Sequence, residues 1–551
     1  MKKAIFLATM MFASAGVSAM ELTSGAGKGG VKKSVATSAP RKQVMRKEFN
    51  QLMKAASENN LKKVKEIIAK HDEDISTIRD LIVAQKNKIE MSGSQLEQSR
   101  ERISYVTELV NLSDKDGDFP LFIAVKNGYG EIVKYLVDHG AVVNKAAANE
   151  AVVNEIVDRS GNTLLFKACC SGNETFVKVL VEYGANVNQK NFRGETPLFW
   201  ACEGSNENIV KYLIDKGADV NKKSKGGQTL LFYASQQGKM NIVEYLVKNH
   251  GANVNEADKR GRTPLFEACR SGNLDLVKYL VEHGADINKE NDQRDTPLLW
   301  VCNPCNESIA KYLIDKGADV NKENDKGDTP LYDACISDNV NVVKYLVEHG
   351  AVVDKEDKCG STPLFGACSN NNVDLVKYLV EHGADINKAT HARETPLSFA
   401  CKLGNWDVVK YLIDHGADVN TDAFFGGTPL IWAVLKENKE IAKYLIDHGA
   451  DVNKTDTSGG GIPLILAVLE GNEEIVKYMV DHGADVNKTS SDEKTPLYIA
   501  VLKGNKEIVK SLVDHGADVN IADSDGKTLL SIAKQKGFNE VVEILKKAGA
   551  K

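Results

Sequence analysis

The sequence lacks most features by which enzymes and nucleic-acid-binding proteins are recognised. Outside its repeated segments it has no Ser/His/Asp order, no paired-carboxylate signature and no Gly-rich catalytic loop. Its formal net charge of −6 argues against nucleic acid as the main partner. After an apolar run in the first 19 residues, no segment is long and apolar enough to cross a bilayer. We therefore expect no catalytic residue, no cofactor and, once a signal segment is removed, no integral membrane segment.

Cysteine and histidine are present, but their spacing is not that of metal or redox sites. Seven of the ten cysteines share one recurring position, and valine fills that position in other copies, which indicates a small apolar core residue. Nine of the eleven histidines precede a Gly-Ala pair, where lysine also occurs, and lysine is a poor substitute for a neutral metal ligand. The pair Cys302 and Cys305 has no second pair to complete a metal site. We expect neither a metal site nor a ladder of disulfides.

What the sequence does contain is one pattern written thirteen times, roughly T-P-L-F-x-A-C-x-x-G-N, then an apolar segment, then H-G-A-D-V-N-K. The step between copies is 33 residues in most cases, and a fixed period in this range indicates a solenoid. The proline position falls at Pro120, Leu164, Pro197, Leu230, Pro264, Pro297, Pro330, Pro363, Pro396, Pro429, Pro463, Pro496 and Leu529.

Each copy predicts two short helices followed by a loop. In the clearest copy, Thr263 is the expected N-cap of the first helix and Pro264 its first residue. Asn273 is the expected N-cap of the second helix, and Gly284 is placed to adopt the left-handed conformation after its end. Two such helices cannot bury an apolar face alone, so the copies must stack to form a continuous core.

This pattern resembles the ankyrin repeat. The resemblance is carried by T-P-L at residues 263–265, the Gly-Asn turn at 272–273 and G-A-D-x-N at 284–288, and it covers residues 118–551. It implies an all-α repeat solenoid of stacked helix–turn–helix units with β-hairpin loops, whose concave face binds other proteins. The chain departs from the family pattern T-P-L-H, because phenylalanine, tyrosine or another residue takes the histidine position. Apolar packing is expected to replace the hydrogen bonds of that histidine.

The ends of the chain predict further segments. Residues 1–19 resemble a bacterial-type Sec signal peptide, with Lys2 and Lys3 before the apolar run and small residues before Met20. Residues 20–47 are predicted to be a basic disordered linker, 48–113 a helical N-terminal cap with an insertion, and 114–551 the thirteen repeats. We expect export by the Sec route to the periplasm or the medium, with delivery to a host as a further destination, and a monomer.

The predicted function is that of a non-enzymatic scaffold or effector that binds a partner protein. Its candidate contact residues are the loop pair Phe424 and Phe425 and the first-helix residues Phe399 and Trp432. Aromatic side chains of this kind often dominate the binding energy of interfaces. The alternative for Phe399 and Trp432 is ordinary packing between helices. Two other functions remain open: an enzyme or enzyme inhibitor in the N-terminal region with the repeats as a targeting module, and a structural spacer of the cell envelope.

Overall fold

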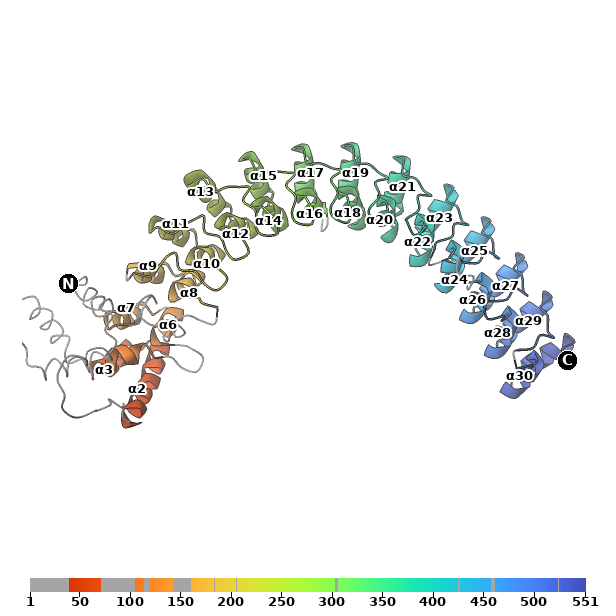
Figure 1. The fold of residues 1–551 in the computed structure, drawn as a ribbon, viewed down its shortest axis with the longest axis horizontal. Helices are drawn as coiled ribbons and strands as arrows, with labels where there is room; N and C mark the ends of the chain where they lie inside the picture. Colours follow the sequence, from red (N-terminus) through yellow and green to blue (C-terminus); the bar gives the residue numbers. More distant parts are fainter. Residues whose placement is uncertain are drawn as a thin grey trace, which may run out of the picture. The chain divides into compact units, whose positions relative to one another are not determined.

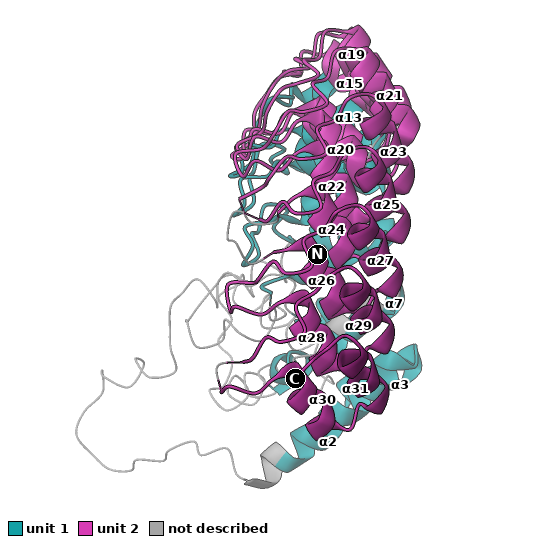
Figure 2. Ribbon diagram, turned by 90° about the vertical axis from the view of Figure 1, so that its right-hand side faces the viewer, with its two compact units in different colours: residues 1–271 teal, residues 272–551 magenta. Residues whose placement is uncertain are grey.

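A computed structural model describes residues 39–70, 105–112, 119–127, 129–141, 160–182, 184–204, 206–302, 306–424, 427–456, 461–523 and 525–551. In these residues it contains 28 helices and no strand. The chain divides into two compact units, residues 1–271 and 272–551 (Figure 2). In each unit short helices alternate with loops, so the predicted all-α repeat solenoid is confirmed.

The first unit contains eleven described helices. The first helices of its repeats are α2 (Ala39–Ser57), α6 (Pro120–Lys126), α8 (Leu164–Cys170), α10 (Pro197–Glu203), α12 (Leu230–Gln236) and α14 (Pro264–Ser271). The second helices are α3 (Leu61–Ala69), α7 (Gly130–Asp138), α9 (Glu174–Glu182), α11 (Glu207–Asp215) and α13 (Met240–His250). Each first helix from α2 to α12 contacts the second helix of its own repeat and the first helix of the next repeat.

The second unit repeats this arrangement. Its first helices are α16 (Pro297–Cys302), α18 (Pro330–Ile336), α20 (Pro363–Ser369), α22 (Pro396–Leu403), α24 (Pro429–Leu435), α26 (Pro463–Glu470), α28 (Pro496–Lys503) and α30 (Leu529–Lys536). Its second helices are α15 (Leu274–Glu282), α17 (Glu307–Asp315), α19 (Val340–Glu348), α21 (Val373–Glu381), α23 (Trp406–Asp414), α25 (Lys439–Asp447), α27 (Glu473–Asp481), α29 (Lys506–Asp514) and α31 (Asn539–Lys547). Within this unit the first helices form the inner row, along its concave edge, and the second helices form the outer row (Figure 1).

The helix ends follow the sequence signals. At the start of α18 the hydroxyl of Thr329 accepts a hydrogen bond from the backbone N–H of Tyr332, and Pro330 follows as the first helical residue. At the start of α19 the Asn339 side chain accepts from the N–H of Val342. Gly350, just beyond α19, has φ +89°, a left-handed conformation that glycine adopts without strain. The predicted pattern of caps is therefore confirmed in this repeat.

Four threonines do not make the expected cap bond: Thr163, Thr196, Thr263 and Thr362. The hydroxyls of Thr263 and Thr362 are buried and have no hydrogen-bond partner. Both threonines still precede a helix that begins with proline. The prediction of a Thr263 cap from sequence is thus wrong in its hydrogen bond, although correct in its position.

The core of each repeat is built from small and medium apolar side chains of the first helix. Leu331, Ala334 and Cys335 of α18 have no exposed surface. All seven cysteines of the recurring position are buried, as the alternation with valine predicts (Cys169, Cys202, Cys269, Cys302, Cys335, Cys368 and Cys401). Burial raises the pKa of the Cys202 thiol to about 12, so this cysteine stays protonated at neutral pH.

In seven of the described repeats one asparagine side chain joins the loop to the next repeat by two hydrogen bonds. Asn387 donates from Nδ2 to the carbonyl of Gly416 (3.2 Å) and accepts on Oδ1 from the backbone N–H of Asp418 (2.8 Å). The same pair of hydrogen bonds is made by Asn188 in the first unit and by Asn288, Asn321, Asn420, Asn453 and Asn487 in the second. We call this series the asparagine ladder. It satisfies backbone groups beyond one helix end and sets the register between neighbours.

The loops of the second unit project from one side of the helical layers (Figure 2). Each loop tip is closed by a backbone hydrogen bond and joined to the neighbouring tip by another. For example, the N–H of Asp357 donates to the carbonyl of Ser361, and the N–H of Lys358 donates to the carbonyl of Lys326. The described loops contain isolated bridges, Ala423 with Gly427 and Ala522 with Thr528, and no paired strands, so the predicted β-hairpins are absent from them.

The N-terminal helices form a repeat-like cap, as the apolar spacing of residues 48–71 predicts. The Asn60 side chain accepts from the N–H of Lys63 at the start of α3, whose buried residues include Val64 and Ile67. The helix α2 begins at Ala39, so the predicted disordered linker is wrong for residues 39–47. Those residues are mostly good helix formers that follow Pro40, a favourable residue in a first turn.

The described part of the predicted insertion completes that cap. Asn111 donates from Nδ2 to the carbonyl of Gly140 (2.9 Å), with the sequence separation found in the asparagine ladder. Tyr105 also donates to the Glu48 carboxylate of α2 (2.7 Å). Residues 105–112 therefore complete the repeat-like unit that α2 and α3 begin, and residues 71–104 are inserted in sequence between these two parts of the unit. Signals for this were available in the Val-Asn pair at 110–111.

Several predictions fall outside the described residues: the signal peptide at 1–19, the linker at 20–38 and most of the insertion between 72 and 104. They stay predictions from sequence. Among the helices that the structure describes, none combines the length and hydrophobicity that a membrane span needs.

Asp354 replaces asparagine in the ladder, and we predict that Asp354→Asn stabilises the second unit. Both carboxylate oxygens accept from the N–H of Asp385 (3.0 Å), but a carboxylate cannot donate to a carbonyl. Desolvation is the main cause that raises the pKa of Asp354, so the native state binds its proton more tightly than the unfolded state. The contribution of Asp354 to the free energy of unfolding therefore falls as pH rises and the carboxyl group ionises. The variant should gain about 1 kcal/mol at pH 7.5 and less at pH 4 in urea unfolding.

The reverse substitution Asn387→Asp is the matched control and should destabilise the same unit. If Asp354→Asn instead lowers the unfolding midpoint at pH 7.5, the ladder does not contribute as described.

Candidate protein-binding surface

One position of each first helix from α6 onward varies from repeat to repeat, and its residue ranges from half-buried, as at Trp432, to fully buried, as at Glu267. It lies three residues after the proline position, and we call it the inner position. In the first unit it is Ile123, Lys167, Trp200, Tyr233 and Glu267; in the second it is Trp300, Asp333, Gly366, Phe399, Trp432, Leu466, Ile499 and Ile532. Of these residues, Phe399 and Trp432 are among the candidates predicted from sequence, whereas Trp200, Tyr233 and Trp300 are not. Counting three residues from every proline position would have found them.

A polar side chain five residues earlier supports several of these inner residues. We call its place the pre-cap position, because it precedes the threonine before the helix. The indole N–H of Trp200 donates to Glu195 Oε2 (3.1 Å), and that of Trp300 donates to Asp295 Oδ2 (3.3 Å). The two positions therefore form a pair within one repeat, in which a carboxylate satisfies a tryptophan.

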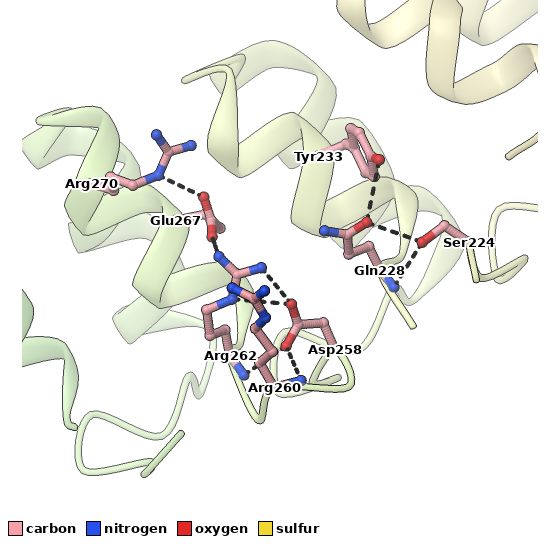
Figure 3. Close-up of polar contacts among 8 residues, drawn as sticks. All are labelled: Ser224, Gln228, Tyr233, Asp258, Arg260, Arg262, Glu267 and Arg270. Atoms are coloured by element: carbon pink, nitrogen blue, oxygen red, sulfur yellow. Dashed lines mark hydrogen bonds and ion pairs between the residues drawn. The ribbon is translucent and has the colours of Figure 1, made fainter. Parts of the chain in front are cut away.

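The same pair takes an ionic form in α14. Glu267, which has no exposed surface, lies at the inner position, and Arg262 lies at the pre-cap position. Arg262 donates to Glu267 (2.9 Å) and to Asp258 (2.7 Å), while Arg270 donates to the other oxygen of Glu267 (2.9 Å), as Figure 3 shows. Two guanidinium groups thus compensate the buried carboxylate, which would otherwise be strongly destabilising.

Trp432 is not supported by a pre-cap side chain of its own repeat. Its pre-cap position is Gly427, which has no side chain, and the indole Nε1 is buried without a hydrogen-bond partner. Its ring instead lies beneath the ammonium of Lys402, with Nζ 4.9 Å from the ring centroid. Lys402 also pairs with Glu394 (3.4 Å). Trp432 is therefore held by packing and a cation–π contact, and its polar group is left unsatisfied.

The loop tip that precedes Trp432 also departs from its neighbours. In the preceding repeats, a lysine of each loop pairs with a glutamate of the loop before it: Lys322 with Glu290, Lys355 with Glu323 and Lys388 with Glu356. Ala389 and Thr421 take these two places in the next pair, so the ion-pair series ends there. Thr421 bonds the hydroxyl of Thr395 instead (3.1 Å).

The structure places the four residues of the hypothesised binding site in different surroundings. Phe424 is 48% exposed, and its ring faces the guanidinium of Arg393 at 5.4 Å. Phe399 is half-buried and packs at an angle against the buried ring of Phe365 (5.8 Å). Phe425 lies outside the described residues. The proposal that these aromatics act together stays a prediction.

A wider apolar surface surrounds Phe399 and Trp432. In α22, α24 and α26 the inner residues are Phe399, Trp432 and Leu466, all half-buried. One turn later these helices expose Leu403 (47%), Leu435 (39%) and Leu469 (40%), and α28 adds the half-buried Leu502. We call this surface the apolar stripe: Phe399, Leu403, Trp432, Leu435, Leu466, Leu469 and Leu502. Residues three or four apart share one helix face, so the stripe is continuous along neighbouring first helices.

The inner row is acidic and not apolar at α18. Asp333 lies at the inner position, with Asp328 at its pre-cap position and Asp295 on the preceding repeat. Desolvation, followed by the charges of Asp328 and Asp295, raises the pKa of Asp333 to about 7. The charge of this part of the surface therefore changes near neutral pH.

No group of three or more potential metal ligands is arranged to hold a metal within the described residues. The described inner row instead offers indole, aliphatic, ammonium and carboxylate groups on a rigid helical support. Such a surface can hold another macromolecule by packing, hydrogen bonds and ion pairs.

Asp333→Asn tests the titration. Because the native pKa is raised above the unfolded value, the native state holds an extra proton between about pH 4 and pH 7. Stability from this group is present at low pH and is lost as pH rises through 7. We expect Asp333→Asn to be about 1 kcal/mol or more stabilising at pH 8 and nearly neutral at pH 4.5 in denaturant unfolding. The exposed Asp492→Asn is the control; an equal pH profile for both variants would refute the assignment.

Comparison with known proteins agrees with the repeat geometry. A family model for ankyrin repeats in three copies matches residues 52–191, 142–224, 221–291, 288–357, 351–423, 420–490 and 464–551. No curated protein matches the chain. The matches together run from residue 52 to the last residue and cover the capped helix pairs, the asparagine ladder and the inner row. The chain belongs to the ankyrin-repeat family.

Proposed function

We propose that the protein is a non-enzymatic scaffold that binds a partner protein through the apolar stripe. Ankyrin repeats are in general modules of protein–protein interaction, and proteins built from them are typically not enzymes. The observation that carries the proposal is the exposure of Leu403, Leu435 and Leu469 on one face of three neighbouring helices. Contiguous exposed apolar surface of this kind marks interaction sites in soluble proteins.

The stripe has the dimensions and rigidity of a binding surface. Four neighbouring first helices at roughly 10 Å spacing give a stripe on the order of 30 Å long. Its side chains project from capped helices whose cores are fully buried, so little ordering accompanies binding and little conformational entropy is lost. Phe399 and Trp432 add aromatic area at one end, where interface hot spots are often aromatic.

The two alternatives fit these observations less well. A spacer needs no exposed apolar stripe on its inner row. In the N-terminal region, the described helices α2 and α3 use their apolar residues to cap the repeats, as the buried Leu52, Val64 and Ile68 show. An enzyme or inhibitor there would depend on the segment between residues 71 and 104.

Paired substitutions in the full-length chain test the stripe. The double variant Leu435→Ser/Leu469→Ser should fold normally by circular dichroism and capture its partner from a lysate of the source cells at least tenfold less well. The double variant Phe424→Ala/Phe425→Ala asks whether the loop tip contributes as well. Val352→Ser is the matched control, because Val352 is 50% exposed but lies in a loop away from the stripe. Equal capture by the control and Leu435→Ser/Leu469→Ser would contradict the proposal.

Export is part of the same proposal and rests on residues 1–19, whose basic start, short apolar run and small residues before Met20 support a Sec signal. The chain would then meet its partner in the periplasm, in the medium or in a host. We expect N-terminal sequencing of protein collected outside the cytoplasm to begin at Met20. Recovery of such protein with Met1 still present would contradict processing.

A further inference from the structure

The unsatisfied indole of Trp432 indicates what chemistry the partner brings. In the described inner rows, Trp200 and Trp300 each donate to a carboxylate at their own pre-cap position. Trp432 has Gly427 there, and this glycine has φ +73°. This left-handed conformation strains any residue with a side chain, and an added Cβ would also lie 2.7 Å from Ile431 Cδ1, so glycine is favoured where the other repeats have their supporting residue. The acceptor that this tryptophan lacks cannot come from the place that supplies it in the other repeats.

The groups around Trp432 favour an anionic acceptor. The ammonium of Lys402 lies over the ring, and its ion pair with Glu394 has an N–O distance of 3.4 Å. The exposed Lys436 follows Leu435 at the end of α24, although Glu437 comes next. An ammonium and an indole N–H thus lie at one end of the stripe, while the chain as a whole carries a net charge of −6. A carboxylate that approaches Trp432 would meet a donor and a cation together.

We propose that the partner segment carries an Asp or Glu side chain beside apolar residues, and that this carboxylate accepts from Trp432 Nε1 and pairs with Lys402. This inference rests on the proposed function of the apolar stripe. The apolar residues of the segment pack on Leu435 and Leu469, and the carboxylate fixes its register at Trp432. Nε1 is buried in the free protein, so this mode of binding requires a local rearrangement at Trp432 that uncovers it.

The loop tip also contains a competing feature. Asp422 has one carboxylate oxygen buried without a partner. A partner that used its main chain could donate an N–H to Asp422 and offer a carbonyl to Trp432, with no need for an acidic side chain. The two modes differ in whether the bound segment must contain Asp or Glu, and that difference can be measured.

A displayed library of random 12-residue peptides, selected on the immobilised full-length chain, provides the probe. Twelve extended residues span about 40 Å, enough to cover the stripe. We expect the enriched peptides to combine Asp or Glu with Leu, Ile, Phe or Trp. A synthetic peptide of this set should bind at least tenfold more weakly when its acid is replaced by the corresponding amide.

Two variants locate the acid. Trp432→Phe keeps the ring but removes the N–H, so it should weaken the acidic peptide at least tenfold and bind the acidic and amide peptides nearly equally. Lys402→Met should reduce the same preference. Trp300→Phe is the matched control in the same unit and should leave peptide binding unchanged. Hydrogen exchange of α24 with wild-type protection confirms that the Trp432→Phe fold is intact.

The outcomes separate this inference from the proposed function. Peptides that lose binding in Leu435→Ser/Leu469→Ser but show no enrichment of acids would overturn the inference and leave the stripe as a binding site. An acid preference that persists undiminished in Trp432→Phe would also overturn it. A library without binders, or binders insensitive to the Leu435→Ser/Leu469→Ser change, would contradict both.

Discussion

The structure depends on the two hydrogen bonds that one asparagine side chain makes across a repeat boundary, which recur at seven boundaries in the described residues. Asn387, for example, gives its amide N–H to Gly416 and takes the N–H of Asp418. Both contacts are to backbone, so the ladder accepts almost any sequence in the next repeat provided that its glycine turn is kept. Buried leucine, alanine and cysteine of the first helices supply the hydrophobic stabilisation, while the ladder fixes how neighbouring repeats align.

With alignment and core secured elsewhere, the inner row of first helices is free to vary, and it varies in a restricted way. A residue at the inner position is supported by the pre-cap residue of the same repeat, as in Trp300 with Asp295 and Glu267 with Arg262. In the first pair a carboxylate supports an indole, and in the second a guanidinium supports a carboxylate. Where support is missing, as at Trp432, the row also becomes apolar over several repeats. The unsupported Trp432 in α24 therefore lies within the apolar stripe, between the stripe residues of α22 and α26.

Most of the fold could be predicted from sequence because its determinants are local and recur. The Thr-Pro start, the Gly-Asn turn and the cysteine that alternates with valine each predict one feature of one repeat, and repetition removes the ambiguity of a single copy. Thr263 shows the limit, because a correctly placed cap residue still depends on hydroxyl geometry that sequence does not encode. The linker prediction failed at residues 39–47, where packing of α2 overrides a composition rich in charge.

The candidate site was less predictable. Phe399 and Trp432 were found because aromatic residues are conspicuous, whereas Leu435 and Leu469 resemble ordinary helix residues in the sequence. Their exposure becomes clear only when the face of each first helix is known. That Trp432 lacks a hydrogen-bond partner is harder still to predict from sequence. It becomes evident only when Gly427 is compared with Asp295 and Glu195, whose bonds to tryptophan are seen in three dimensions.

The spacing of the pre-cap and inner positions has a consequence for how such a chain can change. Each supporting pair lies within six consecutive residues of one repeat, and the asparagine ladder touches only the backbone of the next. A duplication or exchange of a whole repeat therefore moves a complete pair of inner and pre-cap residues, while contacts between repeats, such as Lys388 with Glu356, have to be matched anew. The order of aromatic, acidic and apolar patches along the inner row can be rearranged by recombination alone, so new specificities can arise before any point substitution is selected.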